Sequence, residues 1–185
     1  SEFGAGATAF DYRGYRTDLS MLGSKTQSSR QETDTISRLV YGLATSYLLT
    51  GKQAYLDAAI SGAHYMIDHL CCVDRSLQIA YWYHGVTVLP DGTERKIFAS
   101  EFGDDYNAIP CYEQIYALAG PVQTYRITGD PKIRQDAEET VRLFHRFFKD
   151  KSERGGFYSH IDPITFDPLS DALGHNRGRK NWNSV

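Results

Sequence analysis

The sequence of 185 residues predicts an all-α fold of helical hairpins, with a small β-hairpin inserted in a long loop. Three observations support this prediction. The stretch YRITGDPKIRQDA, residues 125–137, repeats YLLTGKQAYLDAA, residues 47–59. Apolar residues recur at helical spacing on both sides of each Thr-Gly pair. The turns inside the two repeats are short, whereas the connections that follow them are long.

The repeat covers two helices and the turn between them. Tyr47 aligns with Tyr125, an offset of 78 residues, and Gly51 aligns with Gly129. Glycine suits the left-handed residue that ends a helix. Asp130-Pro131 suits the N-cap and the first position of the next helix. We therefore predict two hairpins, each bent at its Thr-Gly pair.

The two helices of each hairpin differ in their apolar faces. A helix over 30–50, opened by a capping box at 29–32, has apolar residues on most sides, and so does its copy at 110–128. Such helices are buried nearly all round. The helix over 131–149 has a narrower apolar stripe and a charged face. Each hairpin is thus expected to have an inner and an outer member.

The long connections cover residues 71–109 and 151–180. The first contains alternating apolar residues around Pro90-Asp91-Gly92, which is typical of a β-hairpin. Both connections must emerge at the N-terminal end of the inner helices. Long structured loops are usually functional, so this end is where a site is expected.

Composition excludes several classes of function. The net charge is −3 without a basic stripe, which disfavours a nucleic-acid partner. No apolar run is long enough for a membrane span. The three cysteines form no C-x-x-C pair, so we expect no metal site, no disulfide framework and a cytoplasmic location. Thirteen tyrosines and nine phenylalanines suit either a carbohydrate-binding surface or an ordinary core.

Alternating inner and outer helices with long loops at one end describe an (α/α)6 toroid. Two hairpins do not close such a ring. We therefore expect residues 1–185 to be a single domain and a fragment of a larger barrel. Its inner helices would be covered by a missing C-terminal half or by self-association. A second repeat, between 12–31 and 154–185, leads us to expect a third inner helix after Lys180.

The segments SRLVYGLATSYLLTGKQAYLDAA, GAHYMIDHL and GGFYSHID resemble the N-acylglucosamine 2-epimerase and cellobiose 2-epimerase superfamily. The resemblance covers residues 12–185 and would correspond to the N-terminal half only. Six-hairpin glycosidases share the architecture. The resemblance implies a sugar substrate, no cofactor, and proton transfer next to the carbonyl of the open-chain sugar.

The resemblance also implies particular site residues. Arg38 matches an arginine near the start of the first inner helix. A general-base histidine is implied in an Asn-x-His setting at the third inner helix. Asn183 fits the start of that setting, but Val185 stands where the histidine is expected.

The residues themselves suggest further candidates at the loop end. Arg38 would hold a substrate oxygen, or else pair with Asp34 on a wet helix face. His84 and His160 lie in the long loops and would act as acid or base, since a histidine pKa lies near neutral. The residues expected to bind substrate are Asn107, Glu113, Tyr116, Lys180 and Asn183.

Two other functions stay open. Loop carboxylates would make a glycoside hydrolase if two of them flank a glycosidic bond, and the candidates are Glu101, Asp104, Asp105, Asp162, Asp167 and Asp171. Alternatively, the protein binds carbohydrate without catalysis. Phosphate-loop and nucleophile-elbow signatures are absent.

Overall fold

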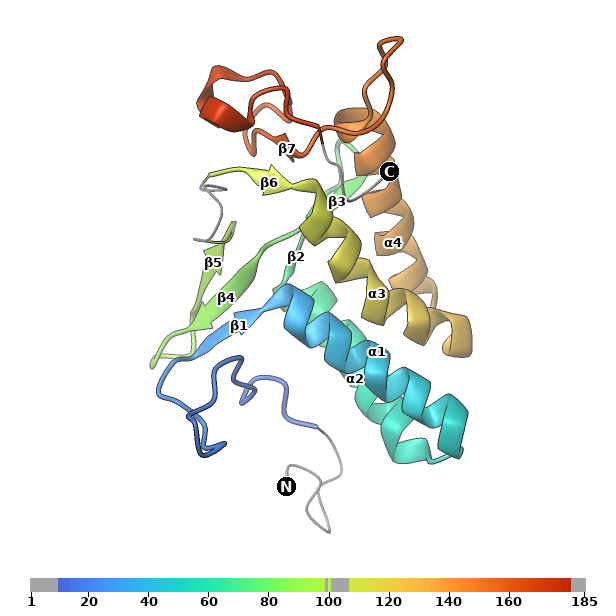
Figure 1. Cartoon of the computed structure of the whole chain (residues 1–185). Helices are drawn as coiled ribbons and strands as arrows, with labels where there is room; N and C mark the ends of the chain where they lie inside the picture. Colours follow the sequence, from blue (N-terminus) through green and yellow to red (C-terminus); the bar gives the residue numbers. More distant parts are fainter. Residues whose placement is uncertain (1–9, 99, 101–106, 181–185) are drawn as a thin grey trace.

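The computed structural model describes residues 10–98, 100 and 107–180. Two helical hairpins stand side by side (Figure 1), formed by α1 (Thr33–Thr50) with α2 (Gln53–His69) and by α3 (Cys111–Thr128) with α4 (Pro131–Leu143). The bounds of α1 and α3 differ by the 78 residues of the predicted repeat. The helix predicted over 131–149 instead changes at Phe144 into a π-helix, Phe144–Phe148.

The turns within the hairpins have the predicted chemistry. Gly51 and Gly129 adopt left-handed φ angles of 67° and 69°, and each donates its N–H to a tyrosine carbonyl of the preceding turn. Asp130 caps α4 by accepting from the N–H groups of Lys132 and Ile133. Both turns lie at the end of the array opposite the strands (Figure 1).

Strands contribute more than an all-α fold predicts. The described residues form three small antiparallel sheets, made of β1 (Arg30–Glu32), β4 (Gly85–Val88) and β5 (Glu94–Ile97); β2 (Cys71–Asp74) and β3 (Ile79–Trp82); and β6 (Ile109–Pro110) and β7 (His160–Ile161). The β4–β5 pair is the predicted hairpin. The other two sheets were not predicted, so the fold is helical hairpins joined to small sheets.

The predicted capping box at 29–32 is wrong. Residues 30–32 form β1, which pairs with β4, and Glu32 makes no side-chain cap to α1. The N–H of Thr33 donates instead to the carbonyl of His84 at 2.8 Å. The N–H of Cys111, which starts α3, donates to the carbonyl of Ser159, also at 2.8 Å. Each inner helix is therefore held at its start by the loop that follows its own hairpin.

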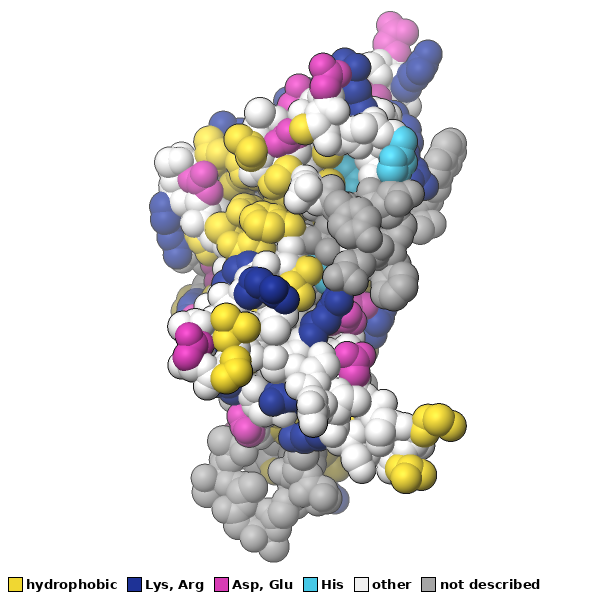
Figure 2. Space-filling view, turned by 90° about the vertical axis from the view of Figure 1, so that its left-hand side faces the viewer, with side chains coloured by type: hydrophobic (Ala, Val, Ile, Leu, Met, Phe, Trp, Pro, Cys, Tyr) yellow, Lys and Arg dark blue, Asp and Glu magenta, His cyan; other side chains and the backbone are white. Residues whose placement is uncertain are grey.

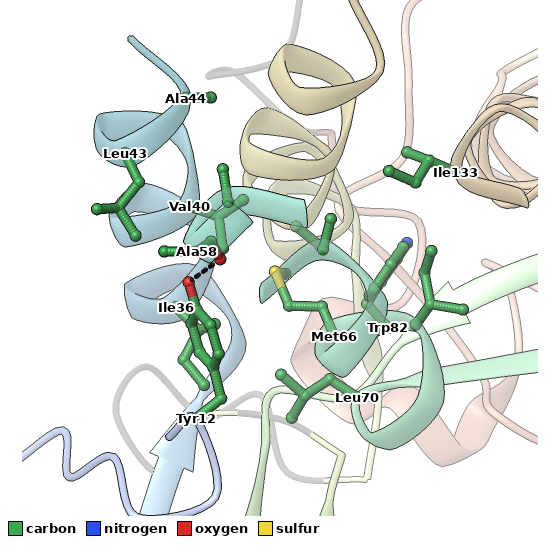
Figure 3. Packing of buried hydrophobic residues seen from close by; sticks show 14 of the residues in the cluster. Tyr12, Ile36, Val40, Leu43, Ala44, Ala58, Met66, Leu70, Trp82 and Ile133 are labelled. Atoms are coloured by element: carbon green, nitrogen blue, oxygen red, sulfur yellow. Dashed lines mark hydrogen bonds between the residues drawn. The ribbon is translucent and has the colours of Figure 1, made fainter. Parts of the chain in front are cut away.

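The main hydrophobic core lies between the two hairpins and extends to β3. Val40, Met66 and Trp82 are almost completely buried in it (Figure 3). Tyr12 enters this core from the N-terminal segment and donates its hydroxyl to the carbonyl of Ala58 at 2.8 Å (Figure 3). The N-terminal segment is thereby fixed against the first hairpin.

The inner helices are not buried all round, contrary to the prediction. Tyr41 on α1 is 46% exposed, and Ile115 and Tyr116 on α3 are 42% and 45% exposed. The prediction counted apolar residues without asking which neighbour would cover each face. The observed exposure is consistent with the separate expectation that two hairpins leave apolar side chains of the inner helices uncovered.

Candidate functional site

The loop end of the inner helices brings several predicted site residues together, as expected from the two long connections. The strands that follow each hairpin lie at this end (Figure 1). His84 lies between β3 and β4, and Glu113 lies in the first turn of α3. The site is thus built by a loop of the first hairpin against a helix of the second.

His84 and Glu113 form a short, buried pair. Nδ1 of His84 lies 2.5 Å from Oε1 of Glu113. His84 is 9% exposed and Glu113 is 6% exposed. The second carboxylate oxygen of Glu113, Oε2, is buried and accepts no hydrogen bond from the described residues. A buried carboxylate oxygen without a donor is costly, which marks this pair as more than a surface ion pair.

The other ring nitrogen of His84 lies against two charged groups of β1. A guanidinium nitrogen of Arg30 is 3.1 Å from Nε2, and Oε1 of Glu32 is 3.6 Å from it. Burial alone would lower the pKa of His84, but the hydrogen bond and the charge of Glu113 outweigh it, so that the pKa is raised. With Nδ1–H directed to Glu113, Nε2 can accept from Arg30, whereas the protonated ring has the charge of Glu32 nearby. Nε2 is thus the ring nitrogen that faces the charged groups of β1.

Arg38 and Tyr116, both predicted site residues, contact each other across α1 and α3. The guanidinium of Arg38 lies 4.8 Å from the ring centre of Tyr116. Arg38 also donates to Asp34 at 2.9 Å, so the predicted ion pair is present as well. Tyr112 stands 6.4 Å edge-on from Tyr116 and donates its hydroxyl to Glu113 at 3.4 Å. These contacts link Arg38 and Tyr116 to the buried pair.

Among the remaining predicted site residues, the structure describes His160, Asn107 and Lys180. His160 is buried on β7, with Nδ1 2.7 Å from the hydroxyl of Ser159. Asn107 is exposed and has a left-handed φ of 58°. Asn183 lies outside the described residues, as does the third inner helix expected after Lys180.

The side chain of Lys180 makes contacts that connect neighbouring segments of the chain. Its ammonium group contacts the carboxylate of Asp150, donates to the carbonyl of Gly155 at 3.1 Å and lies 4.2 Å from the ring centre of Tyr158. Hydrogen bonding from Lys180 holds the pKa of Asp150 well below its usual range. Lys25, its counterpart in the second sequence repeat, likewise donates to a glycine carbonyl, that of Gly14, at 3.0 Å.

We expect Lys180→Met to lower the midpoint of thermal unfolding and to leave the NMR signals of the His84 ring unchanged. The reason is that the ammonium group joins residues 150–158 to the end of the described chain rather than facing the His84 network. Scanning calorimetry and an NMR spectrum of the histidine rings check the two parts separately. A shift of the His84 signals at unchanged stability would show that Lys180 belongs to the candidate site, as the sequence predicts.

The three described loop carboxylates among the hydrolase candidates are engaged in local structure. Asp162 accepts from the N–H groups of Ile164 and Thr165, and Asp167 accepts from that of Leu169. Asp171 pairs with Arg177 at 2.9 Å. Glu101, Asp104 and Asp105 lie outside the described residues. The buried carboxyl groups of the described residues are Glu113, Asp136, Glu139, Asp150 and Asp162, and of these Glu113 is the one paired with His84.

A row of aromatic rings accounts for part of the aromatic surplus. Ring centres are 5.4 Å apart for Phe98 and Tyr83, 5.7 Å for Tyr83 and Tyr81, and 6.1 Å for Tyr81 and Phe166. Burial raises the pKa of Tyr83 to about 12.

Figure 2 shows the side of the molecule on which β1, β4 and β5 lie. Hydrophobic side chains gather in one area of this surface, and acidic and basic side chains are interspersed around it.

Other predicted absences concern metals, disulfides and membranes. Over residues 10–98, 100 and 107–180, no group of His, Cys, Asp or Glu has the arrangement of a metal site. No disulfide joins the three cysteines, which are all described. Within the same ranges, no helix has the length and apolar character needed to cross a bilayer. The cytoplasmic location stays a prediction.

Sequence reasoning missed Arg30, Glu32 and Tyr112. The first two were assigned to a capping box, which would have placed them on a helix. Their i, i+2 spacing is the available signal, because alternate residues of a strand point to the same side. Tyr112 directly precedes Glu113, but nothing in the sequence distinguishes it from a core aromatic.

No protein-family model and no curated protein sequence matches the chain. Solved structures do match it. The cellobiose 2-epimerase from Spirochaeta thermophila superposes with a TM-score of 0.59 at 19% identity, covering 80% of this chain and 33% of that one. The cellobiose 2-epimerase from Bacillus thermoamylovorans gives 0.60 at 15% identity, with 86% and 36% covered.

A glycoside hydrolase of family 76, a mannosidase from Bacteroides thetaiotaomicron, also matches, with a TM-score of 0.50 at 22% identity and 68% and 31% covered. The resemblance to 2-epimerases that the sequence indicated is thus confirmed for the fold. This chain spans about a third of the length of these structures. It shares the helical-hairpin fold of cellobiose 2-epimerases and family 76 glycoside hydrolases.

Proposed function

We propose that this protein acts on carbohydrate, and that its chemistry is proton transfer next to the carbonyl of an open-chain sugar, as in a sugar 2-epimerase or isomerase. The observation that carries the proposal is the buried pair of His84 and Glu113, linked through Tyr112 to Arg38 and Tyr116. The shared fold with cellobiose 2-epimerases supports the class of substrate.

In the neutral form His84 donates Nδ1–H to Glu113, and its lone pair at Nε2, which faces Arg30 in this structure, would serve as the general base once Arg30 turns away from it. In the proposed step Nε2 takes the proton from C2 of the sugar. The electron pair of the C–H bond forms the C1–C2 double bond, and the carbonyl oxygen becomes negatively charged. Return of a proton to the opposite face of C2 inverts that carbon, with no redox change.

The other site residues have roles in the same step. Arg38 would stabilise the negative oxygen, and Tyr116 would stack on the sugar ring or chain. His160 is the candidate for the second proton donor. Asn107, and Asn183 outside the described residues, stay candidates for hydrogen bonds to sugar hydroxyls. No step requires a cofactor.

A six-hairpin glycoside hydrolase is the second candidate. The fold is shared with a family 76 mannosidase, and Glu113 is a buried carboxyl group of the kind that serves as a general acid. The third candidate is a protein that binds carbohydrate without catalysis.

Solvent exchange separates the three functions. In D2O, we expect cellobiose or N-acetylglucosamine to lose the proton signal at C2 in the presence of the protein. His84→Gln should slow the exchange by about 10²-fold or more, since it removes the base. His64→Gln on α2 is the control, because His64 pairs with Asp130 away from the site.

Release of reducing sugar from a disaccharide or a mannoside, without exchange at C2, would favour the hydrolase. Line broadening of the sugar signals without either reaction would leave a binding protein. The absence of exchange, cleavage and broadening across the sugar panel would reject a carbohydrate function for this chain.

A further inference from the structure

The contact between the two hairpins is made by one face of α3. Ala117 and Thr124 on this face are completely buried, and Gly120 between them is buried as well. The hydroxyl of Ser37 on α1 donates to the carbonyl of Ala117 at 3.1 Å and accepts from the N–H of Gly120 at 2.9 Å. A Cβ at Gly120 would lie 2.4 Å from the carbonyl oxygen of Ser37. Close approach of the two helices therefore requires glycine here.

The repeat places equivalent residues on α1, where the central one is exposed and the two flanking ones are half-buried. Residues 78 positions before Ala117, Gly120 and Thr124 are Leu39, Gly42 and Ser46. Gly42 is exposed, and a Cβ built on it would meet no described atom within 4 Å. Glycine in an exposed helix interior costs about 1 kcal/mol relative to alanine. Its presence at the position that α3 uses for helix contact is explained by a contact on this side of α1.

The opposite surface of that contact is also repeated. On α1 the face that receives α3 carries Ser37, Val40 and Ala44, which are fully buried. Their counterparts on α3, 78 residues later, are Ile115, Leu118 and Val122.

These counterparts lie along a groove between α3 and α4. Ile115 lines a hollow of about 220 Å³, and Leu118 and Val122 line another of about 610 Å³. Val141 of α4 borders both hollows, and it is 45% exposed. The surface that should receive a helix is therefore present on α3 and open.

We propose that this groove is an interface that receives another hairpin of the same repeat, and that for this chain the hairpin is α1–α2 of a second copy. Gly42 of one copy would approach α3 of the other as Gly120 approaches α1 within one chain. Both halves of the contact are carried by the same chain, on opposite sides of the array. The contact is thus heterologous, head to tail, and continues from copy to copy.

Light scattering at increasing protein concentration tests the interface. We expect the mass of the wild-type chain to rise above 20.9 kDa in multiples of that value. Gly42→Leu should stay at 20.9 kDa without loss of thermal stability, because a Cβ at this position meets no described atom within 4 Å. Val141→Lys should stay monomeric as well, because it places a charged side chain in the groove. Ala54→Leu, at an exposed position of α2, is the matched control and should associate like the wild type.

Mixing the two monomeric variants gives the sharpest result. Gly42→Leu keeps an intact groove, and Val141→Lys keeps an intact Gly42 face. An equal mixture should therefore form a pair of twice 20.9 kDa and nothing larger. A wild-type chain that stays monomeric at its highest soluble concentration would overturn the proposal, and so would association of Gly42→Leu at wild-type strength. A mixture that stays monomeric would reject the head-to-tail geometry.

Discussion

Gly120→Ala is expected to lower the free energy of unfolding by about 3 kcal/mol, the upper part of the range for overpacking a well-packed contact. The added Cβ would lie 2.4 Å from the carbonyl oxygen of Ser37 and 2.8 Å from Cβ of Val40. Neither is the end of a flexible side chain, so α1 and α3 must move apart. That movement also strains the hydrogen bonds of the Ser37 hydroxyl to α3.

Gly42→Ala is the matched control for this prediction. It makes the same change at the equivalent position of the repeat, where the new methyl group meets nothing described within 4 Å. Alanine should stabilise α1 there by up to about 1 kcal/mol. Urea unfolding at low protein concentration, where association is absent, compares the two variants. Equal effects of the two substitutions would contradict the assignment of Gly120 to the helix contact.

The repeat is the part of the fold that the sequence predicted well, and the reason is physical. A helical hairpin is specified locally, by apolar spacing and by the residues of its turn, so a second copy of the pattern forms a second copy of the structure. Gly51 and Gly129 show this directly, since both have the predicted left-handed φ.

The strands could not be predicted in the same way. Strands of two to four residues carry almost no periodic signal, and their pairing joins segments far apart in sequence, as β1 with β4. Pro110 in β6 even argues against a strand, because proline has no N–H to donate to a sheet. The sheets are recognisable only once the hairpins have brought these segments together.

In the candidate site, too, the positions of residues along the chain were predicted, but their contacts in space were not. His84 and Glu113 were each predicted from their position near the loop end. Their 2.5 Å contact was not, because it depends on how β4 pairs with β1 and so on where the loop places His84. Arg30 and Glu32 reach Nε2 of His84 only because residues 30–32 form a strand.

Glu113→Gln is the second large effect that we expect, and its signature is its dependence on pH. Glu113 raises the pKa of His84 against the opposing effect of burial. A group whose pKa is raised on folding stabilises the fold fully at pH values below its unfolded pKa. That stabilisation is lost as the pH rises through the folded pKa. The wild type should therefore exceed Glu113→Gln in stability most clearly on the acidic side.

Near pH 5.5, Glu113→Gln should lose about 2 to 3 kcal/mol of unfolding free energy, the contribution of a hydrogen bond between charged groups. At a pH well above the raised pKa of His84 the ring is neutral, and the amide still accepts from Nδ1–H. The loss should then shrink to about 1 kcal/mol, the difference between a hydrogen bond to a charged group and a neutral one. Urea unfolding across this range and a titration of the His84 ring signals by NMR measure the two effects. The ring should titrate at a lower pH in the variant.

The surface pair of His64 and Asp130 provides the control, since its atoms lie 2.6 Å apart but the side chain of His64 is 40% exposed. Asn is as good an N-cap as Asp, so Asp130→Asn keeps the cap of α4 and removes only the charge. Its effect should stay below about 1 kcal/mol, because solvent screens an exposed pair. If Glu113→Gln and Asp130→Asn gave the same small, pH-independent loss, the His84–Glu113 contact would be an ordinary ion pair, and the proposed base would lose its support.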